Sequence, residues 1–129
     1  MIAPVTSIYA AFAGLIIVGL AYRVAHLRRR ERIALGHGDN KYMQRAVRAH
    51  ANATETIPIV LILLLLLEIN GGATWQLHII GILAILGRLI HAWWLSRITG
   101  KSFGRTWGTV LTWAVVILLA ILNLKVAIS

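Results

Sequence analysis

The sequence predicts an all-α integral membrane protein built as a bundle of four transmembrane helices. Of its 129 residues, 59% are hydrophobic and only 13% are charged. The mean hydropathy of +0.79 lies far above that of ordinary soluble domains. A transmembrane helix needs about 20 mostly apolar residues, so this length holds four spans with short connections. We therefore expect a single membrane domain over residues 1–129.

Four apolar segments mark the expected spans, and the first of them follows Pro4, a residue tolerated at helix starts. No Lys or Arg precedes that segment, and it is longer than the core of a signal peptide, so we interpret it as a retained helix. Trp75, Trp93, Trp94 and Trp107 lie near predicted span ends, where indoles form an aromatic belt. The expected spans are residues 5–25, 41–69, 75–96 and 106–128.

The second span begins with a polar half. Its strongly apolar part, residues 57–69, is too short to cross about 30 Å of hydrocarbon alone. The polar residues before it must therefore enter the membrane on a face turned away from lipid. We expect Asp39 or Asn40 to cap this helix.

The distribution of basic residues predicts the orientation. Eight Lys and Arg residues lie between Arg23 and Arg48, three lie between Arg97 and Arg105, and the connection after the second span has none. Because positive residues stay inside, we expect both termini to face outward and the first and third connections to face the cytoplasm. The basic residues border apolar spans and meet anionic lipid, so the net charge of +9 does not indicate nucleic-acid binding.

The stretch RAVRAHANATE, residues 45–55, carries the most informative polar pattern. Arg45, Arg48, Asn52 and Glu55 are spaced three, four and three residues apart, which places them on one helix face. A carboxylate inside a span costs about 2.5–3.5 kcal/mol, so Glu55 needs a partner. We expect that partner to be Arg88 of the third span. The alternative is that this pair only fixes helix packing.

Other kinds of chemistry find no support in the sequence. The chain has no cysteine, so a thiol must come from a cofactor. The five histidines are scattered without an HExxH-like pattern, and we expect no metal site. Neither a Ser-His-Asp arrangement nor a glycine-rich phosphate loop is present.

Three segments together resemble a known family. The stretch RAVRAHANATETIP with the leucine-rich run after it, GRLIHAWW in the third span and a Gly-Arg step entering the fourth are similar to the MAPEG superfamily. The name stands for membrane-associated proteins in eicosanoid and glutathione metabolism, and the similarity is to its bacterial branch. This resemblance implies a homotrimer of four-helix subunits. It also implies glutathione bound near the cytoplasmic face, in clefts between neighbouring subunits.

The resemblance also implies roles for individual residues. Arg48, Asn52 and Glu55 match the second-helix positions that bind glutathione, and His91 matches a third-helix position lining the cleft. Arg105 aligns, with one inserted residue, with the catalytic arginine that holds glutathione as a thiolate.

Further arginines are expected to support that site. Arg45 and Arg88 lie near the matched positions, and either Arg23 or Arg28 supplies the first-helix arginine of the family.

The sequence departs from the family at three positions where some members carry tyrosine. Thr56, Leu95 and Thr109 stand there instead, so specialised prostaglandin or leukotriene synthesis is unsupported.

These features are compatible with three functions. The leading hypothesis is a membrane-bound glutathione-dependent transferase or peroxidase acting on lipophilic electrophiles or hydroperoxides. The first alternative is a binding or scaffold protein that kept the fold and lost the chemistry. The second alternative is a small multidrug or proton exporter, which is disfavoured because the first span contains no acidic residue.

Overall fold

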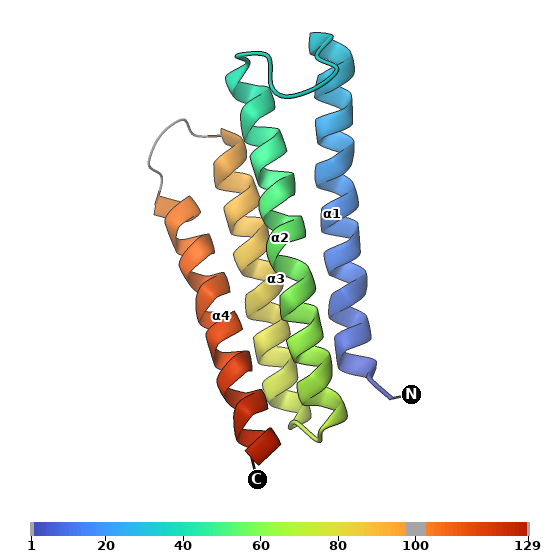
Figure 1. Cartoon of the computed structure of the whole chain (residues 1–129), viewed down its shortest axis with the longest axis vertical. Helices are drawn as coiled ribbons and strands as arrows, with labels where there is room; N and C mark the ends of the chain where they lie inside the picture. The colour runs from blue at the N-terminus through green and yellow to red at the C-terminus, as the bar shows by residue number, and fades with distance from the viewer. Residues whose placement is uncertain (1, 98–102, 129) are drawn as a thin grey trace.

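Four long helices run side by side in the protein (Figure 1). The computed structural model describes residues 2–97 and 103–128 and, within them, all side chains except those of 96–97 and 103–105. All four helices are long and apolar enough to cross a membrane, which confirms the all-α, four-helix membrane fold. The helices are α1 (Pro4–Glu31), α2 (Lys41–Ile69), α3 (Thr74–Arg97) and α4 (Phe103–Ile128).

The central pair of the bundle is α2 and α3. Helix α1 packs on both of them from one side, α4 packs on both from the other, and within the described residues α1 and α4 do not touch. We call the end where α1 stops and α2 starts the loop end, and the opposite end, where α1 starts and α4 stops, the terminal end (Figure 1).

Helix α1 continues six residues past the expected span. It ends when Arg32 adopts a left-handed conformation with φ of 53°. The Arg28 guanidinium then donates hydrogen bonds to the carbonyls of Ile33 (3.4 Å) and Ala34 (3.1 Å). Arginines in the last turn also favour the negative end of the helix dipole. The arginines that follow the first expected span, Arg28 to Arg30, therefore belong to helix α1.

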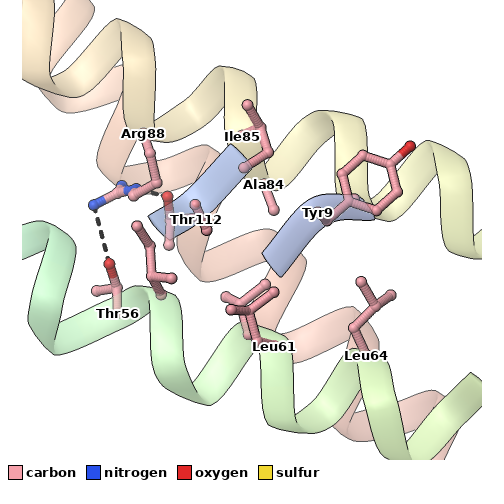
Figure 2. A pocket seen from close by; sticks show the side chains of 12 residues that line it. Tyr9, Thr56, Leu61, Leu64, Ala84, Ile85, Arg88 and Thr112 are labelled. Carbon is pink, nitrogen blue, oxygen red and sulfur yellow. Dashed lines mark hydrogen bonds between the residues drawn. The ribbon is translucent and has the colours of Figure 1, made fainter. Parts of the chain in front are cut away.

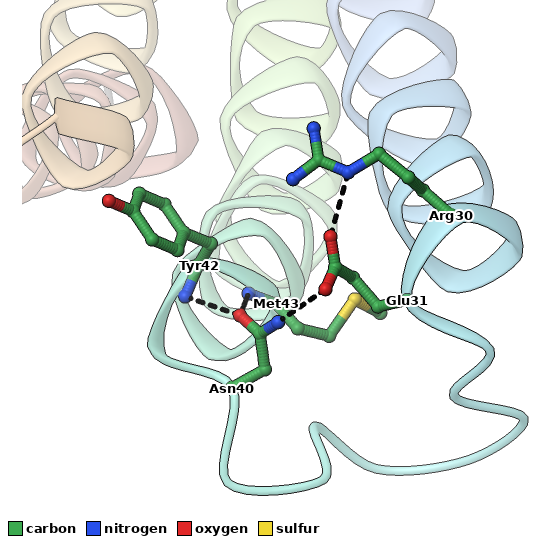
Figure 3. Close-up of polar contacts among 5 residues, drawn as sticks. All are labelled: Arg30, Glu31, Asn40, Tyr42 and Met43. Carbon is green, nitrogen blue, oxygen red and sulfur yellow. Dashed lines mark hydrogen bonds and ion pairs between the residues drawn. The ribbon is translucent and has the colours of Figure 1, made fainter.

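The cap of α2 is Asn40 (Figure 3). Its Oδ1 accepts the backbone N–H of Tyr42 at 2.9 Å, and its Nδ2 donates to Glu31 at 3.1 Å. Glu31 in turn pairs with Arg30 at 2.7 Å. Asp39, the other residue considered as a cap, takes a left-handed conformation with φ of 59° and does not cap the helix.

The apolar core fills the half of the bundle nearest the terminal end. Its buried members come from all four helices: Val5, Tyr9, Val60, Leu64, Leu67, Leu77, Ile80, Ala84, Val115 and Leu119. Apolar side chains also cover the outside, where Phe12, Trp113 and Ile117 are each more than half exposed. Such a surface requires lipid or protein around it. The loop-end half contains buried apolar residues such as Met43 and Ala46 and also the buried polar residues described below.

Candidate functional site

The side chain of Arg88 joins three helices inside the bundle. Arg88 extends from α3, is only 4% exposed, and donates from Nη1 to Asn52 Oδ1 and, at 3.3 Å, to Thr56 Oγ1 on α2. From Nη2 it donates to the Gly108 carbonyl at 2.9 Å and to Thr112 Oγ1, both on α4 (Figure 2). A buried guanidinium needs acceptors for its hydrogens, and here four neutral oxygens accept the four hydrogens of Nη1 and Nη2. The Nε–H is also buried and has no hydrogen-bond partner among the described residues.

The two threonines are arranged so that they can accept from Arg88. Thr56 donates its hydroxyl hydrogen to the Asn52 carbonyl at 2.7 Å, and Thr112 donates to the Gly108 carbonyl at 3.0 Å. Each hydroxyl therefore turns its lone pairs toward the guanidinium.

A close approach of α3 and α4 brings the Gly108 carbonyl within reach. A Cβ at position 108 would lie 2.9 Å from the Gly87 carbonyl oxygen and 2.8 Å from the His91 Cβ, so only glycine fits there.

The expected ion pair between Glu55 and Arg88 does not form. Arg88 contacts Asn52, one turn earlier on α2, and within the described residues the one side-chain ion pair is that of Arg30 and Glu31. Glu55 is instead exposed on the outside of the subunit. The partner of Arg88 on α2 is therefore the amide of Asn52, and not the carboxylate of Glu55 as predicted from the sequence.

The predicted face of α2 lies at the subunit surface. Arg48 and Glu55 are exposed, and Asn52 between them is half-buried. We call these three residues the α2 stripe. Glu55 lies fourteen residues from each end of α2, which corresponds to about 21 Å of helix on either side. A carboxylate at that depth, open to lipid, is costly unless protein covers it.

The other predicted residues occupy different environments. His91 is 6% exposed and packs against Gly108 at the α3–α4 contact. The backbone of Arg105 lies in α4, but its side chain is outside the described part of the chain.

The arginines expected to support the site are also placed differently from one another. Arg28 is engaged with loop carbonyls, as described above, whereas Arg23 is half-buried and close enough to Arg45 for their charges to interact. Arg45 donates to the Lys41 carbonyl at 3.1 Å and lies 4.7 Å over the Tyr42 ring. Of the two first-helix arginines, Arg23 therefore lies near α2 and Arg28 near the loop.

The cavity below Arg88 is too small for a ligand of peptide size. A cavity between Arg88 and Tyr9 offers about 20 Å³, which is room for about one water molecule (Figure 2). No three His, Cys, Asp or Glu residues in the described ranges gather in a way that could hold a metal ion. A larger groove of about 510 Å³ lies between the ends of α2 and α4, next to Leu63 and Asn123 and away from Arg88.

Comparison of the sequence with known proteins identifies the family of this chain. The MAPEG family model matches residues 6–125, nearly the whole chain. The chain belongs to the MAPEG family. It is also similar to the inner membrane protein YecN of Escherichia coli K12 and of E. coli O6:H1 strain CFT073. Each is 36% identical over 120 residues, which cover 93% of this chain and 90% of the relative.

MAPEG proteins are generally associated with glutathione. The acceptors around Arg88 were missed by the sequence analysis, although Thr56 and Thr112 carried a signal. Each hydroxyl donates to the backbone carbonyl four residues earlier in its helix: Thr56 to that of Asn52, and Thr112 to that of Gly108. Polar residues within otherwise apolar helices of a membrane protein commonly mark interhelical hydrogen bonds.

Proposed function

We propose that this protein is a membrane-bound, glutathione-dependent transferase or peroxidase that acts on lipophilic electrophiles or hydroperoxides. The observation that carries the proposal is the α2 stripe, in which Arg48, Asn52 and Glu55 share one outward face within a membrane-spanning helix. Membership of the MAPEG family supports the same function.

The stripe matches the functional groups of glutathione. This tripeptide carries two carboxylates, an amine, two peptide bonds and a thiol. Arg48 suits a carboxylate because a guanidinium forms paired hydrogen bonds with it. Glu55 suits the amine, and Asn52 suits a peptide or carboxylate group. His91 would contribute to the wall of the cleft, as the family resemblance implies.

The site would be completed by a second copy of the chain. Glu55 is exposed at mid-helix, and the cavity below Arg88 holds no more than about one water molecule. A neighbouring subunit packed over the α2 stripe would shield the carboxylate from lipid and supply the second wall of a cleft. We propose the homotrimer of the family as this assembly.

Arg105 is proposed as the catalytic residue. A free thiol has a pKa of about 8.5, and a nearby guanidinium lowers it, so Arg105 would hold the thiol of glutathione as thiolate. The bound thiolate would attack an electrophilic carbon, which forms a thioether and, in a substitution, releases the leaving group as an anion. In the peroxidase reaction two glutathione molecules would together supply two electrons and two protons, reducing the hydroperoxide to an alcohol and water and becoming glutathione disulfide. The protein's own contribution is orientation and charge.

The orientation in the membrane follows from the basic residues. The loop end carries the arginine-rich segment, and we propose that it faces the cytoplasm of a bacterium with both termini in the periplasm. Lipophilic substrates would then reach the site from the bilayer.

Turnover by the purified full-length protein tests this proposal. With glutathione and either chlorodinitrobenzene or cumene hydroperoxide, we expect activity that Arg105→Ala lowers by about a hundredfold. Arg29→Ala, which removes an exposed arginine from the same end, is the matched control and should retain activity. Absence of turnover with both substrate classes would contradict the enzymatic function.

A binding protein without turnover is the second candidate, and one observation favours it. The Thr56 hydroxyl, at a position where related proteins carry tyrosine, donates its hydrogen to the Asn52 carbonyl and has none to offer a ligand. Saturable glutathione binding without conjugation or peroxide reduction would identify this function.

A further inference from the structure

The guanidinium of Arg88 is turned wholly into the protein, and its Nε–H has no hydrogen-bond partner among the described residues. Its four terminal N–H bonds point to Asn52, Thr56, Gly108 and Thr112, and its remaining N–H, on Nε, is buried. Arg88 therefore has no hydrogen left for a ligand at the subunit surface. Any effect that it has on ligand binding must pass through one of its partners.

The contact with Arg88 fixes which way the Asn52 amide faces. Arginine only donates hydrogen bonds and stays protonated in proteins, so the Asn52 atom beside it must be the carbonyl oxygen. The Nδ2 group then branches away from Arg88. Within the described residues Nδ2 has no hydrogen-bond partner, and it is not among the buried polar atoms that lack one. Asn52 thus presents N–H donors, and no acceptor, on the α2 stripe.

We propose that Arg88 is a positioning residue that locks Asn52 as a hydrogen-bond donor. Asn52 would then bind an acceptor oxygen of the ligand, either a peptide carbonyl or a carboxylate, between Arg48 and Glu55. A ligand amine or amide N–H is refused at this position because it would face another N–H. This inference rests on the proposed function, which places the ligand on the α2 stripe, and it assigns the ligand amine to Glu55.

A pair of matched substitutions tests the orientation without any ligand. Asn52→Asp keeps the oxygen that Arg88 needs and gives it a charge that the guanidinium balances. Asn123 is the matched control because it uses the nitrogen of its amide and not the oxygen. Its Nδ2 donates to the carbonyls of Leu63 and Leu119, each at 2.9 Å. Asn123→Asp therefore loses both bonds.

Thermal unfolding in detergent measures the difference between the two variants. We expect the midpoint of Asn52→Asp to equal or exceed that of the wild type and the midpoint of Asn123→Asp to fall by roughly 4 °C or more. An equal fall in both variants would overturn the orientation of Asn52.

Titration with glutathione tests the ligand oxygen. Asn52→Asp replaces the outward donor by an acceptor, so its affinity for glutathione should be roughly tenfold weaker or worse, although the variant remains folded. Unchanged affinity would overturn the assignment of an acceptor oxygen to Asn52.

A second comparison separates positioning from general stability. Thr112→Val removes another acceptor from the same guanidinium and leaves the contact with Asn52 in place. It should lower the unfolding temperature, while glutathione affinity stays within about twofold of wild type. Arg88→Lys should weaken affinity in the folded protein by about fivefold or more, because lysine does not reproduce the fork that orients Asn52. If both variants bind like the wild type, Arg88 has no positioning role.

The failure of this inference is distinguishable from that of the proposed function. If the wild type binds glutathione and Asn52→Asp binds equally well, the function stands and the inference falls. If the wild type does not bind, the proposed function falls together with the ligand oxygen, and the comparison of Asn52→Asp with Asn123→Asp still decides whether Arg88 orients Asn52.

Discussion

The backbone N–H of Thr6 donates to the carboxylate of Glu68 at 2.7 Å, across 62 residues of sequence. The other carboxylate oxygen accepts the N–H of Val5 at 2.8 Å. Helix α1 has no side-chain cap of its own at Ala3. A carboxylate from the end of α2 therefore satisfies the free N–H groups at the start of α1 and faces the positive end of its dipole.

Removing this carboxylate should destabilise the protein. We expect Glu68→Ala to cost about 1–2 kcal/mol, the usual magnitude for loss of a helix cap, and Glu68→Gln to cost less because one acceptor oxygen remains. The measurement is the midpoint of thermal unfolding in detergent. Ser7→Ala, which removes an exposed hydrogen bond in the same turn, is the control. A loss for Ser7→Ala as large as that for Glu68→Ala would contradict the capping role.

The contact between α3 and α4 should not tolerate a larger residue at its centre. Gly108→Ala places a Cβ 2.9 Å from the backbone oxygen of Gly87, so the helices must separate, and we expect a cost of about 1–3 kcal/mol. Gly87→Ala meets only side-chain atoms, the nearest at 3.3 Å, and should cost less. Unfolding midpoints of the two variants compare them directly. Equal midpoints would show that this close approach does not govern stability.

Much of the fold could be predicted because hydropathy sets the helices of a membrane protein. Helix α2 covers the same residues as the span predicted there, including its polar first half. Helix α1 continues to Glu31, beyond the apolar segment, and Arg28 stabilises its end with hydrogen bonds to loop carbonyls, which hydropathy does not report. The cap of α1 by Glu68 joins residues 62 apart, and local patterns do not contain such contacts.

The candidate site was predicted less completely than the fold. Helical spacing placed Arg48, Asn52 and Glu55 on one face, and the structure has them so. Spacing along one helix does not specify which member of the stripe meets Arg88 on another helix. Charge complementarity favoured Glu55, but packing brings Asn52 to Arg88. The second wall of the proposed cleft would come from a neighbouring subunit, and no local pattern in a single sequence gives the position of such a subunit.

The exposed Glu55 leads to a prediction about assembly. Native mass spectrometry of the protein released from detergent should give three times the mass of the 14.2 kDa chain. The physical reason is that a carboxylate at mid-helix is shielded from lipid only when another subunit covers it. A purely monomeric protein that remains folded and binds glutathione would contradict the proposed cleft.

Reporter fusions test the orientation of the protein in the membrane. Alkaline phosphatase fused after residue 129 should be active, because the enzyme folds in the periplasm. The same reporter inserted between Leu35 and His37 should be inactive, since the arginines beside this loop hold it in the cytoplasm. The reverse pattern would overturn the proposed topology.

Glutathione binding to the α2 stripe is the central claim, and isothermal titration calorimetry tests it most directly. Detergent-purified wild-type protein should bind glutathione saturably, Arg48→Ala should lose that binding, and Arg29→Ala should retain it. Arg29 is the appropriate control because it is an exposed arginine at the same end of the bundle. If the folded wild type binds no glutathione, or if Arg48→Ala binds it normally, the account of this site is wrong.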